Sequence, residues 1–156
     1  MSDQTDAPRG SVETYFAPIH SAARMRDVDE VKKQLQLGVE VDLPNGKAEN
    51  GDGGNTALWF AAQGPLPNGI EIARILIEQG ANPNRICEHG TTPLHLAALW
   101  GHLRVVKFLV ENGASHEIAD ADGQTPFDRA RNSNNRPGME LSLVIDFLRQ
   151  LENQNA

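Results

Sequence analysis

The sequence has little of several features that define common protein classes. A single cysteine, Cys87, excludes an internal disulfide framework and any zinc site built on several thiolates. No apolar run approaches the roughly 20 residues that cross a bilayer. The N-terminal stretch MSDQTDAPRGSVET has neither the basic start nor the apolar segment of a secretory signal. We therefore expect a protein of a reducing compartment, the cytoplasm, with no membrane partner.

Aromatic residues and positive charge are also scarce. Aromatics make up 5 % of the 156 residues, so a core must be built from aliphatic side chains and alanine. Lys and Arg number 14 against 21 Asp and Glu, which gives a formal net charge of −7. Because binding to phosphates requires a surplus of basic residues, we expect no nucleic-acid partner. The length predicts one domain.

What the sequence does contain is a repeat. The stretch GTTPLHLAALWGHLRVVKFLVENGA, from Gly90, matches GNTALWFAAQGPLPNGIEIARILIEQGA, from Gly54. Two further copies are PIHSAARMRDVDEVKKQLQLG, from Pro18, and GQTPFDRAR, from Gly123, which continues as LVIDFLRQL. The repeat is about 33 residues long with insertions, a period typical of a solenoid of stacked units.

Each copy has the pattern of a helix, a turn, a second helix and an extended connection. Thr92 is suited to cap the first helix, and Pro93 to stand at its first position. Leu94, Ala97 and Ala98 recur at helical spacing and form one apolar face. The second helices are expected to end at glycines, which favour the left-handed backbone of a helix end: Gly38, Gly80 and Gly113.

These residues resemble the ankyrin repeat. The family signature T-P-L-H-x-A-A stands at residues 92–98, and the later glycines and paired valines follow at the family's spacing. The resemblance implies an all-α ankyrin-repeat solenoid of stacked helix–turn–helix units joined by hairpin fingers. We predict a disordered tail at 1–14, a repeat domain at 15–151 and a frayed end at 152–156. The four repeats are expected at about 17–50, 51–84, 85–117 and 118–151.

Some copies depart from the family pattern. Trp59 stands where the family favours histidine, and we expect it to pack in the core. The first and fourth copies are polar, as the capping units of a solenoid must be. The first connection carries an insertion within residues 43–53, at the edge where ankyrin fingers bind partners. Whether that insertion contacts a partner is left open.

Residues capable of chemistry do not form a convincing active site. Cys87 and His89 lie two apart in a finger, which suggests a nucleophile and its base, but no acid or oxyanion site accompanies them. We interpret this segment as an ordinary exposed finger. The resemblance implies a structural role for His95, which occupies the signature position. We expect a non-enzyme without cofactor or metal.

The resemblance implies that a partner protein binds to the concave surface of fingers and first helices. Site residues are expected where the repeat leaves positions free to vary. One of them, Trp100, either anchors an interface or packs over the neighbouring repeat. The predicted partner-binding residues are Arg24, Met25, Asp52, Asn55, Gln63, Glu88, His89, Thr91, Leu99, Trp100, Asp122, Gln124, Arg131 and Asn132.

An acidic segment also bears on the partner. Residues 111–128 contain no Lys or Arg but five carboxylates: Glu111, Glu117, Asp120, Asp122 and Asp128. This favours either a partner with a basic surface or a solvated acidic face that aids solubility. We expect a monomer that acts as an inhibitor or scaffold. The alternatives are an immunity or antitoxin-type inhibitor of a bacterial toxin or enzyme, a self-assembling structural protein, and an enzyme that uses Cys87.

Overall fold

The structure is a computed structural model, which describes residues 17–46, 54–64, 67–133 and 140–154. Within these ranges it contains eight α-helices and one short 3₁₀ turn, and no strand. The predicted tail at 1–14 lies outside the described residues, as does most of the first insertion, including Asp52. The predicted all-α architecture is confirmed.

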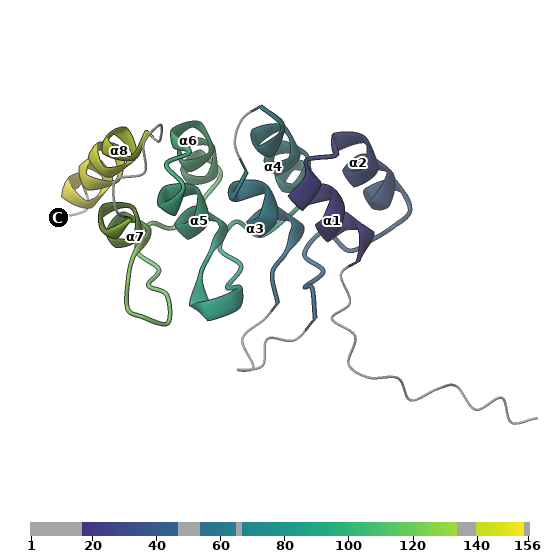
Figure 1. The fold of residues 1–156 in the computed structure, drawn as a ribbon, viewed down its shortest axis with the longest axis horizontal. Coiled ribbons are helices and arrows are strands. Elements are labelled where there is room, and N and C mark those ends of the chain that lie inside the picture. Colours follow the sequence, from purple (N-terminus) through teal and green to yellow (C-terminus); the bar gives the residue numbers. More distant parts are fainter. Residues whose placement is uncertain (1–16, 47–53, 65–66, 134–139, 155–156) are drawn as a thin grey trace, which may run out of the picture.

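The helices form two parallel rows (Figure 1). The first helices of the four repeats are α1 (Pro18–Met25), α3 (Ala57–Ala62), α5 (Pro93–Leu99) and α7 (Pro126–Asn132). The second helices are α2 (Val28–Gln36), α4 (Asn68–Glu78), α6 (Leu103–Glu111) and α8 (Leu141–Gln154). Each first helix packs against its own second helix and against the first helix of a neighbouring repeat. The connections extend from one side of the stack as fingers, one of which contains the 3₁₀ turn η1 (Glu88–Gly90).

Several helices begin and end at residues that favour a helix terminus. The Thr56 hydroxyl accepts from the Trp59 amide at 3.3 Å, and the Thr125 hydroxyl accepts from the Asp128 amide at 3.3 Å. The second helices of the first three repeats are followed by glycines with φ between 83° and 89°, a region that favours glycine: Gly38, Gly80 and Gly113. The predicted role of these glycines is confirmed.

The core is aliphatic, as the shortage of aromatic residues predicts. The alanine pairs Ala61–Ala62 of α3 and Ala97–Ala98 of α5 are fully buried. Their small side chains let the first helices of neighbouring repeats pack closely. Between the two helix rows lie buried branched side chains, among them Leu58, Ile72, Leu76, Leu94, Val105 and Leu109.

The last repeat covers its own aromatic side chain with charge. The ring of Phe127 faces two guanidinium groups. Its centroid lies 5.9 Å from Cζ of Arg131 and 5.8 Å from Cζ of Arg149. This arrangement agrees with the expected polar cap at that end of the stack. None of the described helices combines the length and apolarity that a membrane crossing requires.

Candidate functional site

Hydrogen bonds tie neighbouring fingers to each other. The Asn55 side chain accepts from the Glu88 amide at 3.1 Å and donates from Nδ2 to Oε2 of Glu88 at 3.0 Å. The next finger is tied in turn, because the Ala121 amide donates to the His89 carbonyl oxygen at 3.0 Å. The fingers therefore present their side chains on one continuous surface.

Histidines tie the first helices to the following finger. Nδ1 of His95 accepts from the Thr92 amide at 3.1 Å, so Nε2 carries the proton and donates to the Gln124 carbonyl oxygen at 3.0 Å. His20 lies 2.6 Å from the Leu43 carbonyl oxygen in the first repeat. Burial lowers the pKa of both imidazoles, which keeps them neutral. The expected structural role of His95 agrees with these contacts.

Trp59 occupies the same repeat position in α3. Its indole Nε1 donates to the Thr91 hydroxyl oxygen at 3.0 Å, and that hydroxyl donates to the Glu88 carbonyl oxygen at 2.7 Å. The indole also meets the ring of Phe60 edge-on, with centroids 5.1 Å apart. Trp59 packs against the core but is only half-buried, which corrects the expectation that it is a core residue.

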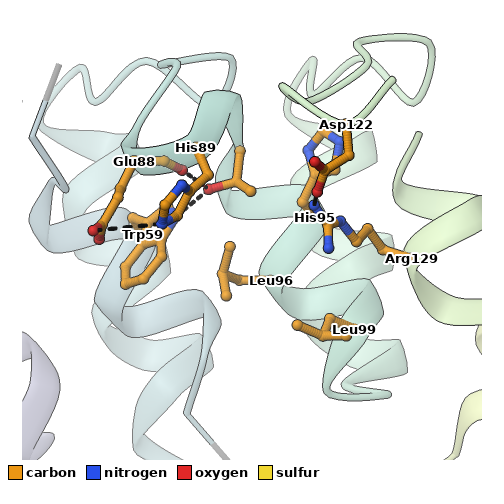
Figure 2. A pocket seen from close by; sticks show the side chains of 9 residues that line it. Trp59, Glu88, His89, His95, Leu96, Leu99, Asp122 and Arg129 are labelled. Carbon is orange, nitrogen blue, oxygen red and sulfur yellow. Dashed lines mark hydrogen bonds and ion pairs between the residues drawn. The ribbon is translucent and has the colours of Figure 1, made fainter. Parts of the chain in front are cut away.

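Trp59 forms one wall of a groove of about 400 Å³ between the first helices and the fingers (Figure 2). Leu96 and Leu99 of α5 supply apolar surface between that wall and the side of the groove formed by Asp122 and Arg129. The remaining lining residues are Glu88, His89, Thr91 and His95. The groove is thus built from three successive repeats, with α5 and its finger in the middle.

The far side of the groove is an ion-pair network. Arg129 donates from Nε to the carboxylate of Asp120, and from Nη2 to the carboxylate of Asp122 at 2.8 Å. Burial opposes the ionisation of Asp120, whose side chain is 0 % exposed. Hydrogen bonds from Arg129 and from two backbone amides outweigh this, so the pKa of Asp120 is lowered. The pKa of Arg129 is raised by the same pair. Asp120 and Arg129 therefore stay ionised.

The comparisons with known proteins place this architecture in a family. A family model described as "Ankyrin repeats (3 copies)" matches residues 19–120. The chain belongs to the ankyrin repeat family. Repeats of this family are generally protein–protein interaction modules without catalytic activity.

Similar proteins of this family come from different organisms and differ in length. It is 30 % identical over 136 residues to the putative ankyrin repeat protein FPV230 of fowlpox virus, and the match covers 72 % of each chain. It is 31 % identical over 110 residues to the inactive serine/threonine-protein kinase TEX14 of Bos taurus, covering 70 % of this chain but 7 % of that protein. An ankyrin repeat-containing protein of Schizosaccharomyces pombe, P1E11.10, is 44 % identical over 69 residues, covering 44 % of this chain and 32 % of that protein.

The ankyrin groove brings together five of the predicted partner-binding residues, whose positions come from α5 and from two fingers: Glu88, His89, Thr91, Leu99 and Asp122. Asn55 is 6 % exposed and serves as the brace of Glu88. Gln124 lies half-buried beside the groove, with its backbone carbonyl bonded to His95.

The other predicted residues lie at the ends of the first helices. Arg24 and Met25 end α1, where Met25 is 77 % exposed. Gln63 caps α3, and its carbonyl oxygen lies 3.2 Å from Nε2 of His102. Two exposed residues end α7, Arg131 and Asn132. None of these residues lines the groove, so their role in binding stays a prediction.

Trp100 lies at the C-terminal end of α5. It is half-buried and packs against the hydrophobic core, and it does not line the groove. Of the two roles expected for Trp100, these contacts favour packing over the neighbouring repeat. Its role in an interface stays a prediction.

Two of the five carboxylates in the acidic segment serve the fold. Asp120 is paired with Arg129, and the Asp128 carboxylate accepts from the amide and the hydroxyl of Thr125 at 3.1 and 3.0 Å. The acidic surface that a partner meets is therefore smaller than residues 111–128 suggest.

Four lining residues were absent from the sequence prediction: Trp59, His95, Leu96 and Arg129. Leu96 and Arg129 share one repeat position, the fourth residue of the first helix, where the other copies have Ser21 and Phe60. Variation among the copies at that position was the signal that could have identified it. Trp59 was assigned to the core because it replaces a histidine.

Cys87 is not exposed, which corrects the interpretation of its finger. The side chain is fully buried and donates from Sγ to the Arg85 carbonyl oxygen at 3.6 Å. Burial raises the pKa of the thiol and so disfavours the nucleophilic thiolate. His89, by contrast, is exposed on η1. Among the described residues, no group of three or more His, Cys, Asp or Glu side chains could hold a metal ion.

Proposed function

We propose that this ankyrin protein binds another protein through its concave surface and acts as an inhibitor or scaffold without chemistry of its own. The observation that carries this proposal is the groove, which combines apolar side chains of α5 with polar side chains of two fingers. Well-formed concave sites of this size and composition are typical of binding sites. The groove is expected to be rigid, because its lining residues belong to fingers joined by hydrogen bonds and to helices packed against each other.

The charge of the fingers favours a partner with a basic surface. The described fingers, residues 39–46, 81–92 and 114–125, carry six carboxylates and one guanidinium. The second helices carry seven carboxylates and six basic groups, so they are nearly balanced. Even with Arg129 neutralising Asp120, the fingers are distinctly acidic, which steers a basic surface toward the groove.

The alternatives differ in how they use the same chain. An immunity or antitoxin-type inhibitor of a bacterial toxin or enzyme would use the concave surface, and the identity of the partner would reveal it. Self-assembly would appear as a rise in scattering mass over a concentration series, whereas we expect a monomer. The burial of the Cys87 thiol argues against an enzyme that depends on it. A reducing compartment, the cytoplasm, suits this free thiol.

Affinity capture with two matched double variants tests the proposal. One variant carries Leu99→Ala and Glu88→Gln in the groove, and the other carries Leu143→Ala and Glu78→Gln on the second helices, both exposed positions. Proteins that are captured by the wild type from its native cell and identified by mass spectrometry should be lost at least ten-fold with the groove variant. The second-helix variant should retain them.

Thermal melting of both variants separates binding from folding. Loss of partners with the melting temperature kept close to that of the second-helix variant supports the concave interface. Equal capture by both variants would overturn the proposal, since the partner would then bind elsewhere.

A further inference from the structure

The groove combines three features: an indole wall, an apolar floor and a carboxylate at the rim. The floor consists of Leu96, nearly buried, and Leu99, half-buried. A ligand that satisfies all three must have an aliphatic portion, a group that stacks on an aromatic face, and positive charge. Among protein side chains, arginine meets these requirements best.

The indole of Trp59 is held in place before any ligand arrives. Its Nε1 bond to Thr91 and its edge contact with Phe60 fix the ring from two sides. A fixed ring loses no rotational freedom when a ligand stacks on it, which favours binding. Guanidinium groups stack on tryptophan more readily than on the smaller aromatic rings.

The carboxylate of Glu88 is also positioned in advance. Oε2 accepts from Nδ2 of Asn55 at 3.0 Å, and Oε1 lies 3.7 Å from Nε2 of His89. A carboxylate has about four acceptor positions, so a neutral amide donor leaves it able to pair with a guanidinium. The buried Asn55 is thus a positioning residue for Glu88.

The one cation in the lining does not repel a second. Arg129 is bound to two carboxylates, Asp120 and Asp122, and its side chain is 25 % exposed. The lining itself carries two carboxylates, Glu88 and Asp122, against this single guanidinium, which is also paired with the buried Asp120 behind it. The groove therefore has a net negative charge beside its apolar floor.

We propose that the groove takes an arginine side chain of the partner protein, with the guanidinium stacked on Trp59 and paired with Glu88 and the aliphatic stem over Leu96. This inference rests on the proposed function, since it names the residue that the partner would insert. A volume of about 400 Å³ is sufficient for one long side chain.

Short peptides test the inference without knowledge of the partner. The probe is acetyl-Ala-Ala-Arg-Ala-Ala-amide, compared with peptides that carry citrulline, norleucine or lysine at the central position. The readout is the indole ¹H–¹⁵N signal of Trp59 in the full chain, assigned with Trp59→Phe, and the Trp100 signal serves as an internal reference. We expect a saturable shift with arginine and at least ten-fold weaker binding of citrulline and norleucine.

A matched pair of charge variants tests the role of Glu88. Glu88→Gln should weaken the arginine peptide at least five-fold, while Glu78→Gln on α4 should leave its affinity unchanged. Thermal melting of both variants verifies the fold. Equal binding of lysine or norleucine, no saturable shift, or full affinity of Glu88→Gln would each overturn the inference.

The two proposals can fail separately. If the peptides do not bind but the groove double variant still loses its captured partners, the arginine inference falls and the concave interface stands. If the partners are also retained by the groove variant, both proposals fall.

Discussion

The indole nitrogen of Trp59 lies 3.0 Å from the hydroxyl oxygen of Thr91 and replaces a bond that histidine makes elsewhere in the stack. In the next repeat, Nε2 of His95 lies at the same distance, 3.0 Å, from the carbonyl oxygen of Gln124, the counterpart of Thr91. A side chain that joins two repeats thus also forms a wall of the groove. The stability of the stack and the shape of the groove are linked at this residue.

A double-mutant cycle should measure this link. Trp59→Phe keeps an aromatic ring but removes the donor, and Thr91→Val removes the acceptor. We expect each change to lower the free energy of unfolding by about 1 kcal/mol, and the pair to show a coupling of about 1 kcal/mol. Urea unfolding provides the measurement. Thr91→Ser, which keeps the hydroxyl, is the control, and purely additive losses would contradict the bond's contribution.

The buried pair Asp120–Arg129 should contribute far more than its exposed neighbour. Arg129→Met leaves the Asp120 carboxylate buried without its cation, which should cost about 3 kcal/mol. Asp122→Asn changes a carboxylate that is 68 % exposed and should cost less than about 0.5 kcal/mol. Denaturant midpoints of the two variants give the comparison. If Arg129→Met lowered the stability as little as Asp122→Asn does, the buried pair Asp120–Arg129 would contribute little.

The repeat architecture could be predicted because it is written several times in the sequence. The caps, the alanine faces and the closing glycines recur at fixed spacing, and each copy supports the others. The groove could be predicted only in part. Leu99 and Glu88 were found because the repeat does not require them, whereas Trp59 was missed because one ring serves both packing and the groove wall.

Burial within the fingers was the hardest property to predict. Cys87 and Asp120 occur in polar segments that suggest exposed loops, yet both side chains are buried. Neighbouring fingers pack side by side, and contacts of this kind join residues about 33 positions apart, such as Asn55 and Glu88. Local sequence pattern does not contain that information.

Two glycines at equivalent positions should respond differently to alanine. Gly90 and Gly123 both have φ of +72°, but a Cβ on Gly90 would lie 2.7 Å from the Ala121 amide nitrogen, whereas one on Gly123 would meet nothing within 4 Å. Gly123→Ala should cost about 1 kcal/mol for the left-handed backbone. Gly90→Ala adds overpacking and should cost about 3 kcal/mol. Equal shifts in melting temperature would show that the fingers separate easily.

The Cys87 thiol should be protected in the folded protein. Burial shields Sγ and raises its pKa, so little thiolate is present near neutral pH. We expect an aromatic disulfide reagent to react at least 100-fold more slowly with native protein than with protein in urea. A native rate close to that of the unfolded chain would contradict the burial of the side chain.

Three histidines whose rings are bonded to backbone carbonyl oxygens should make stability depend on pH. Burial lowers the pKa of His20, His95 and His102, so the unfolded chain binds more protons than the native one in mildly acidic solution. The contribution of these histidines to the free energy of unfolding should be complete above their unfolded pKa of about 6.5. It should be lost as the pH falls from that value toward the lower pKa values of the native protein. Urea midpoints between pH 7.5 and 5.5 measure this slope.

Single histidine variants assign the slope to the buried rings. His95→Gln removes one proton-linked site and should flatten the dependence of the urea midpoint on pH, although it lowers stability at pH 7.5 because the bond to Gln124 is altered. In the native protein, protonation of Nδ1 of His95 would oppose the Thr92 amide, which is why we expect this imidazole to contribute to the slope. A slope that persists in full in His95→Gln would show that the His95 imidazole does not contribute to it.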